Sequence, residues 1–305
     1  MRRLLPLVLL LAALPARGQS SGLAFLEIGP DAAGMALGDA GVALATGPFV
    51  VERNPAGLAA ESGSALGLTH HQWIADVSTY GVAGRFDAGG LGSMGLFVRA
   101  TGTTDLESRQ RPGPRDGTFD VQFVSAGAAL ARNLGPVRLG ITGRYLSERI
   151  FSASATGYAA DFGVQLPLVR ESVTLGAALL NVGSMEELVD RPTELPTTVR
   201  VGAAVAPFRV LSFEDGATLI DAVLTVEFSQ NTVTEQSRLH VGAATTVLET
   251  VQVRLGYVSN DALRDFSAGL GFEAGGIRLD YALLPFEAGF GGPGHVFSLV
   301  YGGSK

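Results

Sequence analysis

The residues best suited to metal binding or acid–base chemistry are four histidines, His70, His71, His240 and His295. Adjacent residues of a β-strand point to opposite faces, so His70 and His71 on a strand cannot converge on one metal ion. His240 is the best candidate base for a hydrolase, but no Gly-x-Ser-x-Gly nucleophile motif accompanies it. The absence of cysteine excludes thiolate metal ligands and a cysteine nucleophile. We therefore expect a protein that is not an enzyme and that carries no catalytic residue, metal or cofactor.

The composition is that of an apolar, folded chain. Glycine supplies 41 of 305 residues, roughly twice its usual share. Charged residues make up 17%, below the usual quarter, and the mean hydropathy is +0.29. The net charge of −7 argues against a nucleic-acid partner, because such binding needs a basic surface.

Residues 1–18 have the pattern of a secretory signal peptide. Arg2 and Arg3 precede a short apolar core, and Ala16 and Gly18 offer small residues at the cleavage site, so the mature chain is expected to begin at Gln19. After this segment, no uncharged apolar run approaches the roughly 18 residues that a membrane helix needs. An exported, apolar chain without a membrane helix is typical of a closed β-barrel, in which every backbone polar group pairs between strands.

Alternating residues support this interpretation. In residues 137–146 one face carries valine, leucine, isoleucine, glycine and tyrosine, while Arg138 and Arg144 fall on the other. The same separation recurs in later segments, and a charge facing lipid near the bilayer midplane costs about 2–4 kcal/mol for Arg or Lys. The sequence therefore predicts an all-β fold, a transmembrane antiparallel β-barrel of about 14 strands over residues 62–305. A soluble β-sandwich or solenoid is the alternative.

The charged residues on the inward face carry both signs, which predicts ion pairs in a filled lumen. This expected lumen charge network consists of Arg85, Arg99, Arg138, Arg144, Asp161, Arg200, Glu227, Arg254, Glu273, Arg278 and Asp280.

Residues 19–61 lack the alternating pattern and are expected to form a plug or strap inside the barrel. Asn54 is a good N-cap and Pro55 suits the first helical position, so a short helix is expected there. A mobile periplasmic tail is the alternative for this segment. Residues 107–117, with three arginines and two prolines, are expected to form a long polar loop at the rim.

Several motifs resemble the PorV/PorQ family of bacterial outer-membrane proteins. The run FLEIGPDAAGMALGDAGVA at positions 25–43, followed by NPAGL at 54–58, is similar to the opening of that family. The stretch HQWIADV at 71–77 resembles the family's His-x-x-Trp-apolar-Ala-Asp stretch. The residues that carry these motifs are Gly34, Gly38, Asp39, Asn54, Pro55, Gly57, His71, Trp73 and Asp76. Asn-Pro-Ala near the N-terminus is shared with FadL-type transporters, whose barrels have fourteen strands and an N-terminal hatch.

The resemblance implies a location in the bacterial outer membrane, in contact with its lipid. It also implies a part in type IX protein secretion, in which the barrel engages secretion-machinery components or secreted cargo proteins. The alternative is a FadL-like transporter of small hydrophobic molecules. Copurified secreted proteins would favour the first function, and lipid or detergent bound in the lumen the second.

Overall fold

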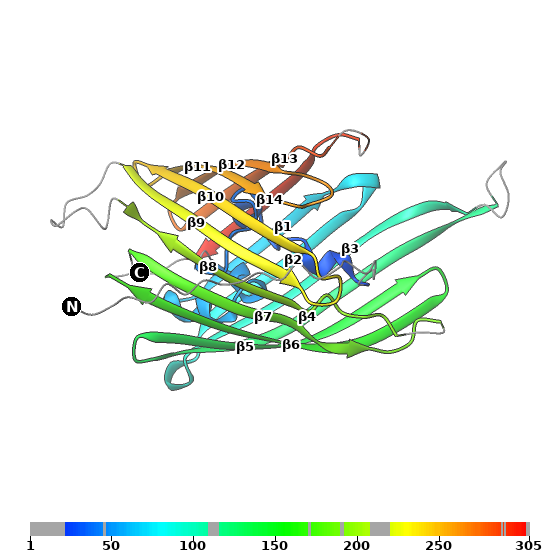
Figure 1. Ribbon diagram of the computed structural model, residues 1–305, viewed down its shortest axis with the longest axis horizontal. Coiled ribbons are helices and arrows are strands. Elements are labelled where there is room, and N and C mark those ends of the chain that lie inside the picture. The colour runs from blue at the N-terminus through cyan, green and yellow to red at the C-terminus, as the bar shows by residue number, and fades with distance from the viewer. Residues whose placement is uncertain are drawn as a thin grey trace, which may run out of the picture.

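The computed structural model describes residues 22–44, 47–108, 116–169, 172–189, 192–207, 220–287, 289 and 291–302. The expected signal peptide at residues 1–18 and most of the expected rim loop at residues 107–117 lie outside these residues. The described chain forms one closed β-barrel with an N-terminal segment inside it (Figure 1).

Fourteen strands make the barrel, and each pairs antiparallel with its neighbours in sequence. Pairing of the first strand with the last, from Ala65 opposite Gly302 to Gln72 opposite His295, closes the wall. The strands are β1 (Ala65–Gln72), β2 (Ser78–Asp87), β3 (Ser93–Ser108), β4 (Gly117–Leu134), β5 (Val137–Ile150), β6 (Ala153–Leu168), β7 (Val173–Met185), β8 (Thr198–Val205), β9 (Ile220–Asn231), β10 (Ser237–Val247), β11 (Val251–Val258), β12 (Phe266–Ala274), β13 (Ile277–Leu284) and β14 (Gly294–Gly302). The expected fold class and strand number are confirmed.

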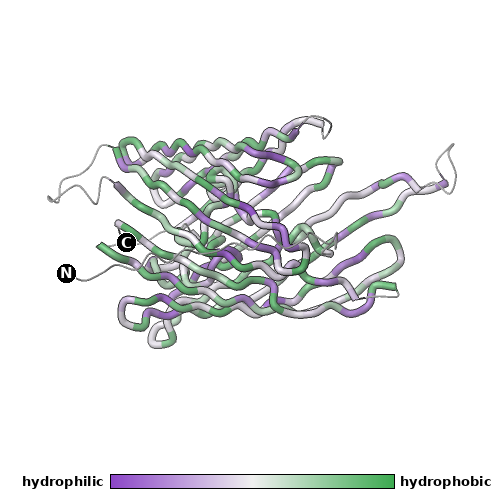
Figure 2. Tube along the Cα trace, in the orientation of Figure 1, coloured by the Kyte–Doolittle hydropathy of each residue, from purple (hydrophilic) through white to green (hydrophobic). Residues whose placement is uncertain are grey.

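The barrel is apolar on its outside and polar within. Large hydrophobic side chains such as Leu255, Leu270 and Tyr301 are more than half exposed, whereas the alternate positions carry buried arginines, acids and hydroxyl groups. Apolar and polar residues accordingly alternate along each strand (Figure 2). A closed wall with this polarity is suited to lipid on one side and a polar lumen on the other, and the protein is placed in the bacterial outer membrane. Among the described residues, no helix is both long and apolar enough to cross a membrane.

The two ends of the barrel differ in the length of their connections. At the end of the barrel where β14 finishes, the connections after β4, β10 and β12 are only two or three residues long, and the connection after β8, residues 206–219, is the exception. At the other end, longer segments follow β3, β7, β11 and β13, and the two-residue turn after β5 is the exception. In outer-membrane barrels the short turns face the periplasm and the long loops face outward, and this assigns the two ends here.

Residues 22–44 and 47–61 run through the lumen from the outward end to the periplasmic end, and we call them the plug. The Gly22 N–H donates to the Glu194 carbonyl in the outward β7–β8 connection, and Glu61 lies just before β1 at the other end. The plug contains one short helix, α1 (Ala32–Met35), and the 3-10 turns η1 (Ala24–Glu27), η2 (Pro48–Glu52) and η3 (Pro55–Ala60). Further 3-10 turns, η4 (Ile74–Asp76) and η5 (Gly89–Leu91), connect strands.

Apolar plug residues pack on small inward residues of the wall. Phe49, Val51 and Leu58 are almost fully buried against alanines of β1, β2 and β4 and against Phe97 of β3. Near the outward end, Phe25 stacks on Phe123 of β4 at 5.3 Å between ring centres. Burial of such side chains contributes roughly 1.5–3 kcal/mol each, so the plug is an integral part of the core.

Two irregularities interrupt the regular wall. Between β6 and β7 the register shifts at Asp161, where Asn181 adopts a φ of 60°. The Asp161 carboxylate accepts the Asn181 N–H at 2.7 Å and so satisfies the donor that the bulge frees. The second irregularity lies near the outward end of β3, where the register with β4 shifts between Thr103 and Leu106.

Candidate functional site in the barrel lumen

Arg53 holds the plug together from its centre. Its Nη1 pairs with the Asp31 carboxylate, and its Nε donates to Asp39 Oδ1 at 3.0 Å. All three groups are buried, and a buried charge is tolerated only when paired and hydrogen-bonded. Arg53 therefore fixes two distant parts of the plug, residues 31 and 39, against the end of η2.

Two glycines make room for this arginine. A β-carbon at Gly34 would lie 2.0 Å from Arg53 Nη2, and one at Gly41 would lie 2.5 Å from Arg53 Cδ. Both distances are well below van der Waals contact, so any side chain there would displace the guanidinium. This is the physical reason for the glycine at position 34 of the opening motif.

Gly38 and Asp39 join the plug to the wall. Gly38 has a φ of +67° and packs on the backbone of Tyr257 in β11, where a β-carbon would lie 2.6 Å from the Tyr257 carbonyl oxygen. Asp39 Oδ2 accepts from Arg200 Nη2 of β8 at 3.1 Å. Arg200 also pairs with Glu227 of β9. The Asp39 carboxylate thus bridges one plug arginine and one wall arginine.

These contacts shift the pKa values of the plug residues. Burial by itself raises the pKa of the Asp39 carboxyl, but Arg200 and Arg53 lower it by more, so it lies well below its usual range. Burial opposes the charged form of Arg53, yet Asp31 and Asp39 raise its pKa above the ordinary value. Both groups are therefore charged at neutral pH.

Asn54 anchors the second half of the motif. Its Oδ1 accepts the Ala56 N–H at 3.1 Å, which is the expected cap of a turn beginning at Pro55. Its Nδ2 donates to the Val42 carbonyl at 2.7 Å and to the wall carbonyl of Val164 at 3.1 Å. Gly57 lies against Val50, whose Cγ2 would be 2.3 Å from a β-carbon at Gly57. Asn54 thereby links plug, cap and wall.

The inward charges of the wall form two kinds of ion pair. Within the wall, Arg144 pairs with Asp161, and Asp280 receives both Arg254 at 2.7 Å and Arg278 at 2.9 Å. Other wall arginines reach carboxylates of the plug, in the pairs Arg85 with Glu61, Arg99 with Glu52, and Arg200 with Asp39. Arg138 is also buried on the inner face. Glu273 differs from the rest of the expected network, because it is exposed near the end of β12.

The residues of the third motif, at positions 71–77, lie in three different surroundings. His71 is fully buried, with its Nε2 3.3 Å from the Pro30 carbonyl of the plug. Trp73 packs edge-on against Phe286 at 4.9 Å between ring centres, beside the plug cluster of Ile28 and Met35. Asp76 is exposed in the outward β1–β2 turn. His70 points outward, so the two histidines lie on opposite faces of β1.

His240 forms a serine–histidine pair that serves the plug. Its Nδ1 lies 2.7 Å from the Gly38 carbonyl, which can only accept, so Nδ1 carries the proton. Nε2 then accepts from Ser229 Oγ at 2.8 Å. The adjacent cavity of about 30 Å³ has room for a water molecule but for no larger substrate. We assign this pair to plug anchoring.

Among the described residues, the lumen has a cavity on each side of the plug. The small one, of about 30 Å³, lies toward the outward end beside Asp39 and Arg200. The larger, of about 550 Å³, opens at the periplasmic end between the plug and β5, β7–β11 and β13. Its walls mix apolar residues such as Leu37 and Val223 with Arg254 and Arg278.

Between these cavities, plug residues 36–43 lie directly on inward glycines of the wall. A β-carbon at any of these glycines would approach plug atoms to 2.9 Å or less. Gly176 pairs with Gly202, and Gly242 pairs with Gly256, so the glycines are neighbours across adjacent strands. The five positions are Gly176, Gly202, Gly242, Gly256 and Gly269. The plug backbone therefore occupies space that side chains fill elsewhere.

Sequence reasoning did not identify the plug's own charged residues. Asp31, Glu52, Arg53 and Glu61 each contribute to the ion pairs described above. Glu27 is also used, because Asn231 Nδ2 donates to its Oε1 at 2.7 Å. The sequence did contain a sign of their role, because charged residues in a segment expected to lie inside a lumen must be paired there.

The fold is similar to that of solved outer-membrane transporters. The toluene transporter TbuX of Ralstonia pickettii superimposes with a TM-score of 0.58 at 14% identity, over 90% of this chain and 98% of that one. The toluene transporter TodX of P. putida gives 0.59 at 9% identity, over 91% and 99%. A FadL homologue from Pseudomonas aeruginosa gives 0.51 at 11% identity, over 89% and 98%.

The likeness extends over whole barrels. At these identities it establishes the fold, a FadL-like fourteen-strand barrel. No protein-family model and no curated protein sequence matches the chain.

Proposed function

We propose that the protein passes small hydrophobic molecules across the outer membrane, and that the plug closes the passage in the state described here. The FadL-like fold supports this, since two of the similar structures are toluene transporters and the chain covers nearly their full length. The observation that carries the proposal is the pair of luminal cavities, separated by plug residues 36–43 lying on wall glycines.

The wall glycines explain how movement of the plug would open the passage. They offer no side chain to fill the lumen if the plug moves away, so displacement of residues 36–43 joins the two cavities along β7–β12. The larger cavity already presents Leu37, Leu44 and Val223 to a hydrophobic molecule. Its arginines would hold the polar end of an amphiphile.

A reversible lock on the plug tests this function. The chain has no cysteine, and a β-carbon at Gly242 would lie 2.9 Å from Leu37 Cβ, which a small backbone shift converts to disulfide geometry. Cells that produce the Leu37→Cys/Gly242→Cys variant should take up radiolabelled toluene only under reducing conditions. Each single-cysteine variant is the control and should be insensitive to oxidation. Uptake that is the same with and without the wild-type protein would contradict the proposal.

A second candidate function is the PorV-like role in protein secretion, which a different observation favours. β3 pairs with β2 only as far as Gly102, and β4 pairs with β5 only from Val121. The rest of this hairpin extends past its neighbours at the outward end (Figure 1), where a protein partner could be engaged. Deletion of the gene should then change the secreted proteome and leave toluene uptake unchanged. The transport function predicts the reverse result.

A further inference from the structure

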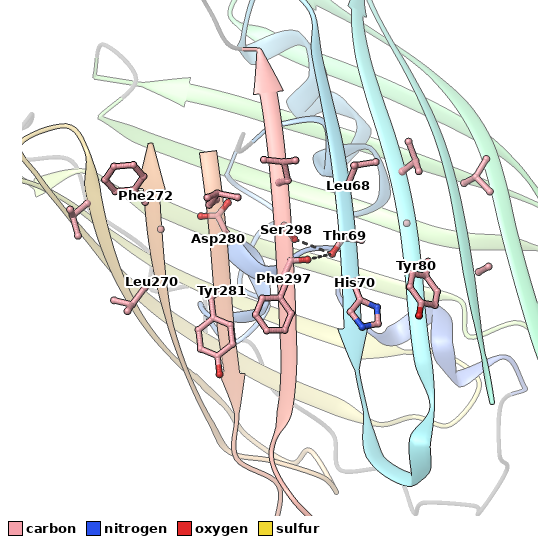
Figure 3. A pocket seen from close by; sticks show the side chains of 18 residues that line it. Leu68, Thr69, His70, Tyr80, Leu270, Phe272, Asp280, Tyr281, Phe297 and Ser298 are labelled. Carbon is pink, nitrogen blue, oxygen red and sulfur yellow. Dashed lines mark hydrogen bonds between the residues drawn. The ribbon is translucent and has the colours of Figure 1, made fainter. Parts of the chain in front are cut away.

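The lipid-facing wall is hollowed over β11–β14 and β1–β3. This groove has a volume of about 980 Å³ and is lined by outward side chains such as Leu68, Leu270 and Phe297 (Figure 3). The residues lie on the outer face, so the groove opens to the membrane and is separate from the luminal cavities. Its existence does not depend on the proposed transport function.

Strand register orders the side chains of the groove into two rows. An aromatic row crosses four strands, because Tyr80 pairs with His70, His70 with Phe297, and Phe297 with Tyr281. His70 and Tyr80 stack at 4.6 Å between ring centres. Two residues nearer the periplasm, an aliphatic row joins Val98, Val82, Leu68, Leu299 and Leu279. Aromatic girdles of this kind mark the membrane interface in outer-membrane barrels.

A polar pocket adjoins the aromatic row on the outward side. It has a volume of about 350 Å³ and shares Tyr80 and Ala100 with the apolar groove, so the two hollows are continuous. The register places Ser78, Gly102, Gln122 and Arg149 in one row across β2–β5.

The pocket combines one cation with hydrogen-bond acceptors. Arg149 donates to Gln122 at 3.0 Å and is exposed on the same outer face as the apolar residues of β5. Asp76 and Asp120 line the pocket as well. Arginine is suited to a phosphate, and carboxylates accept hydrogen bonds from hydroxyl groups. Polar pocket, aromatic row and aliphatic groove thus follow one another from the outward end toward the membrane.

We propose that this surface binds an outer-leaflet lipid with a phosphorylated, hydroxyl-rich headgroup. The headgroup phosphate pairs with Arg149, its hydroxyl groups donate to Asp76 and Asp120, and its acyl chains lie in the groove beneath Tyr80. The occupant follows from the continuity of the groove with the lipid-facing wall and from the order of polarity along it. A free hydrophobic molecule would leave the charged pocket unused.

Native mass spectrometry of the detergent-purified full-length protein tests the proposal, with bis-phosphorylated lipid A added at defined ratios. Wild-type protein should retain lipid A through detergent exchange. Arg149→Gln should weaken retention roughly tenfold, the effect of losing one charge-assisted contact. Val82→Trp should lower retention by filling the groove. The matched controls are Arg132→Gln, an exposed arginine at the opposite end of β4, and Ile141→Trp, an exposed position of β5 outside the groove. Both should behave as wild type.

Two results would overturn the proposal. One is equal weakening by the variants and their matched controls. The other is retention of phosphatidylethanolamine as strongly as lipid A and without effect of Arg149→Gln, which would make the groove an ordinary lipid-facing wall. Because every substitution is on the exposed outer face, each variant is first checked for a folded barrel by its mobility shift on an unboiled gel.

Discussion

At the scale of single residues, the lumen is organised around a few buried charges that each serve two partners. Arg53 joins Asp31 to Asp39, Asp39 joins Arg53 to Arg200, and Asp280 joins two wall arginines. A shared charge of this kind is sensitive to substitution, because its loss leaves more than one group unpaired in a buried setting.

Replacement of Arg53 by methionine should release the plug while leaving the wall intact. The change leaves Asp31 without its partner and should destabilise plug docking by about 3–5 kcal/mol, the usual cost of breaking a buried ion pair. Trp73 is the single tryptophan and packs beside the plug cluster, so its fluorescence during urea titration reports undocking. Arg132→Gln serves as an exposed control, and an unchanged midpoint for Arg53→Met would refute this role.

Plug docking should also weaken at low pH. The folded pKa of Asp39 lies below its ordinary value of 3.8, so its contribution to stability is fully present above that value and is lost as the pH falls toward the folded pKa. The difference in plug-docking free energy between wild type and Asp39→Asn, read from Trp73 fluorescence in urea, should therefore be constant above about pH 5 and should shrink below about pH 4. A difference that does not change with pH would contradict this role of Asp39.

At the scale of elements, the strands and the presence of a plug could be predicted from the sequence, whereas the path and the contacts of the plug could not. The alternation of residues has the period of a strand, and an arginine such as Arg144 on the apolar face would meet lipid, so face and register follow from local sequence. Residues 22–61 have no such period. The pairing of Arg85 with Glu61 or Arg99 with Glu52 depends on where an irregular chain crosses the lumen. For the same reason, the role of Arg53 emerges only in three dimensions.

A side chain at a wall glycine should displace the plug. A β-carbon at Gly256 would lie 1.9 Å from the Gly38 nitrogen, so Gly256→Leu should open the lumen and raise ion conductance in planar bilayers well above that of wild type. Gly143 on β5 has open space around it, and Gly143→Leu should conduct as wild type does. Equal conductance of Gly256→Leu and wild type would show that the plug tolerates the larger residue.

At the scale of the whole molecule, barrel and plug form one packed unit. The wild-type protein should therefore migrate differently on a denaturing gel before and after boiling, as closed outer-membrane barrels do. It should also conduct poorly in planar bilayers, because the plug crosses the lumen and its charges are paired. A large, steady conductance from intact protein would contradict the closed state.

The path of the plug has a consequence for biogenesis. Its contacts encircle the lumen, from Ala32 with Ser298 of β14, through Asn54 with Val164 of β6, to Gly38 with Ser267 of β12. Gly22 lies at the outward rim while β1 starts at the periplasmic end. Once the β1–β14 seam is sealed, the plug could reach this path only by threading through a narrow ring. We therefore expect the pairing of β1 with β14 to form last. The plug would by then already be packed against the nascent sheet and would set its curvature.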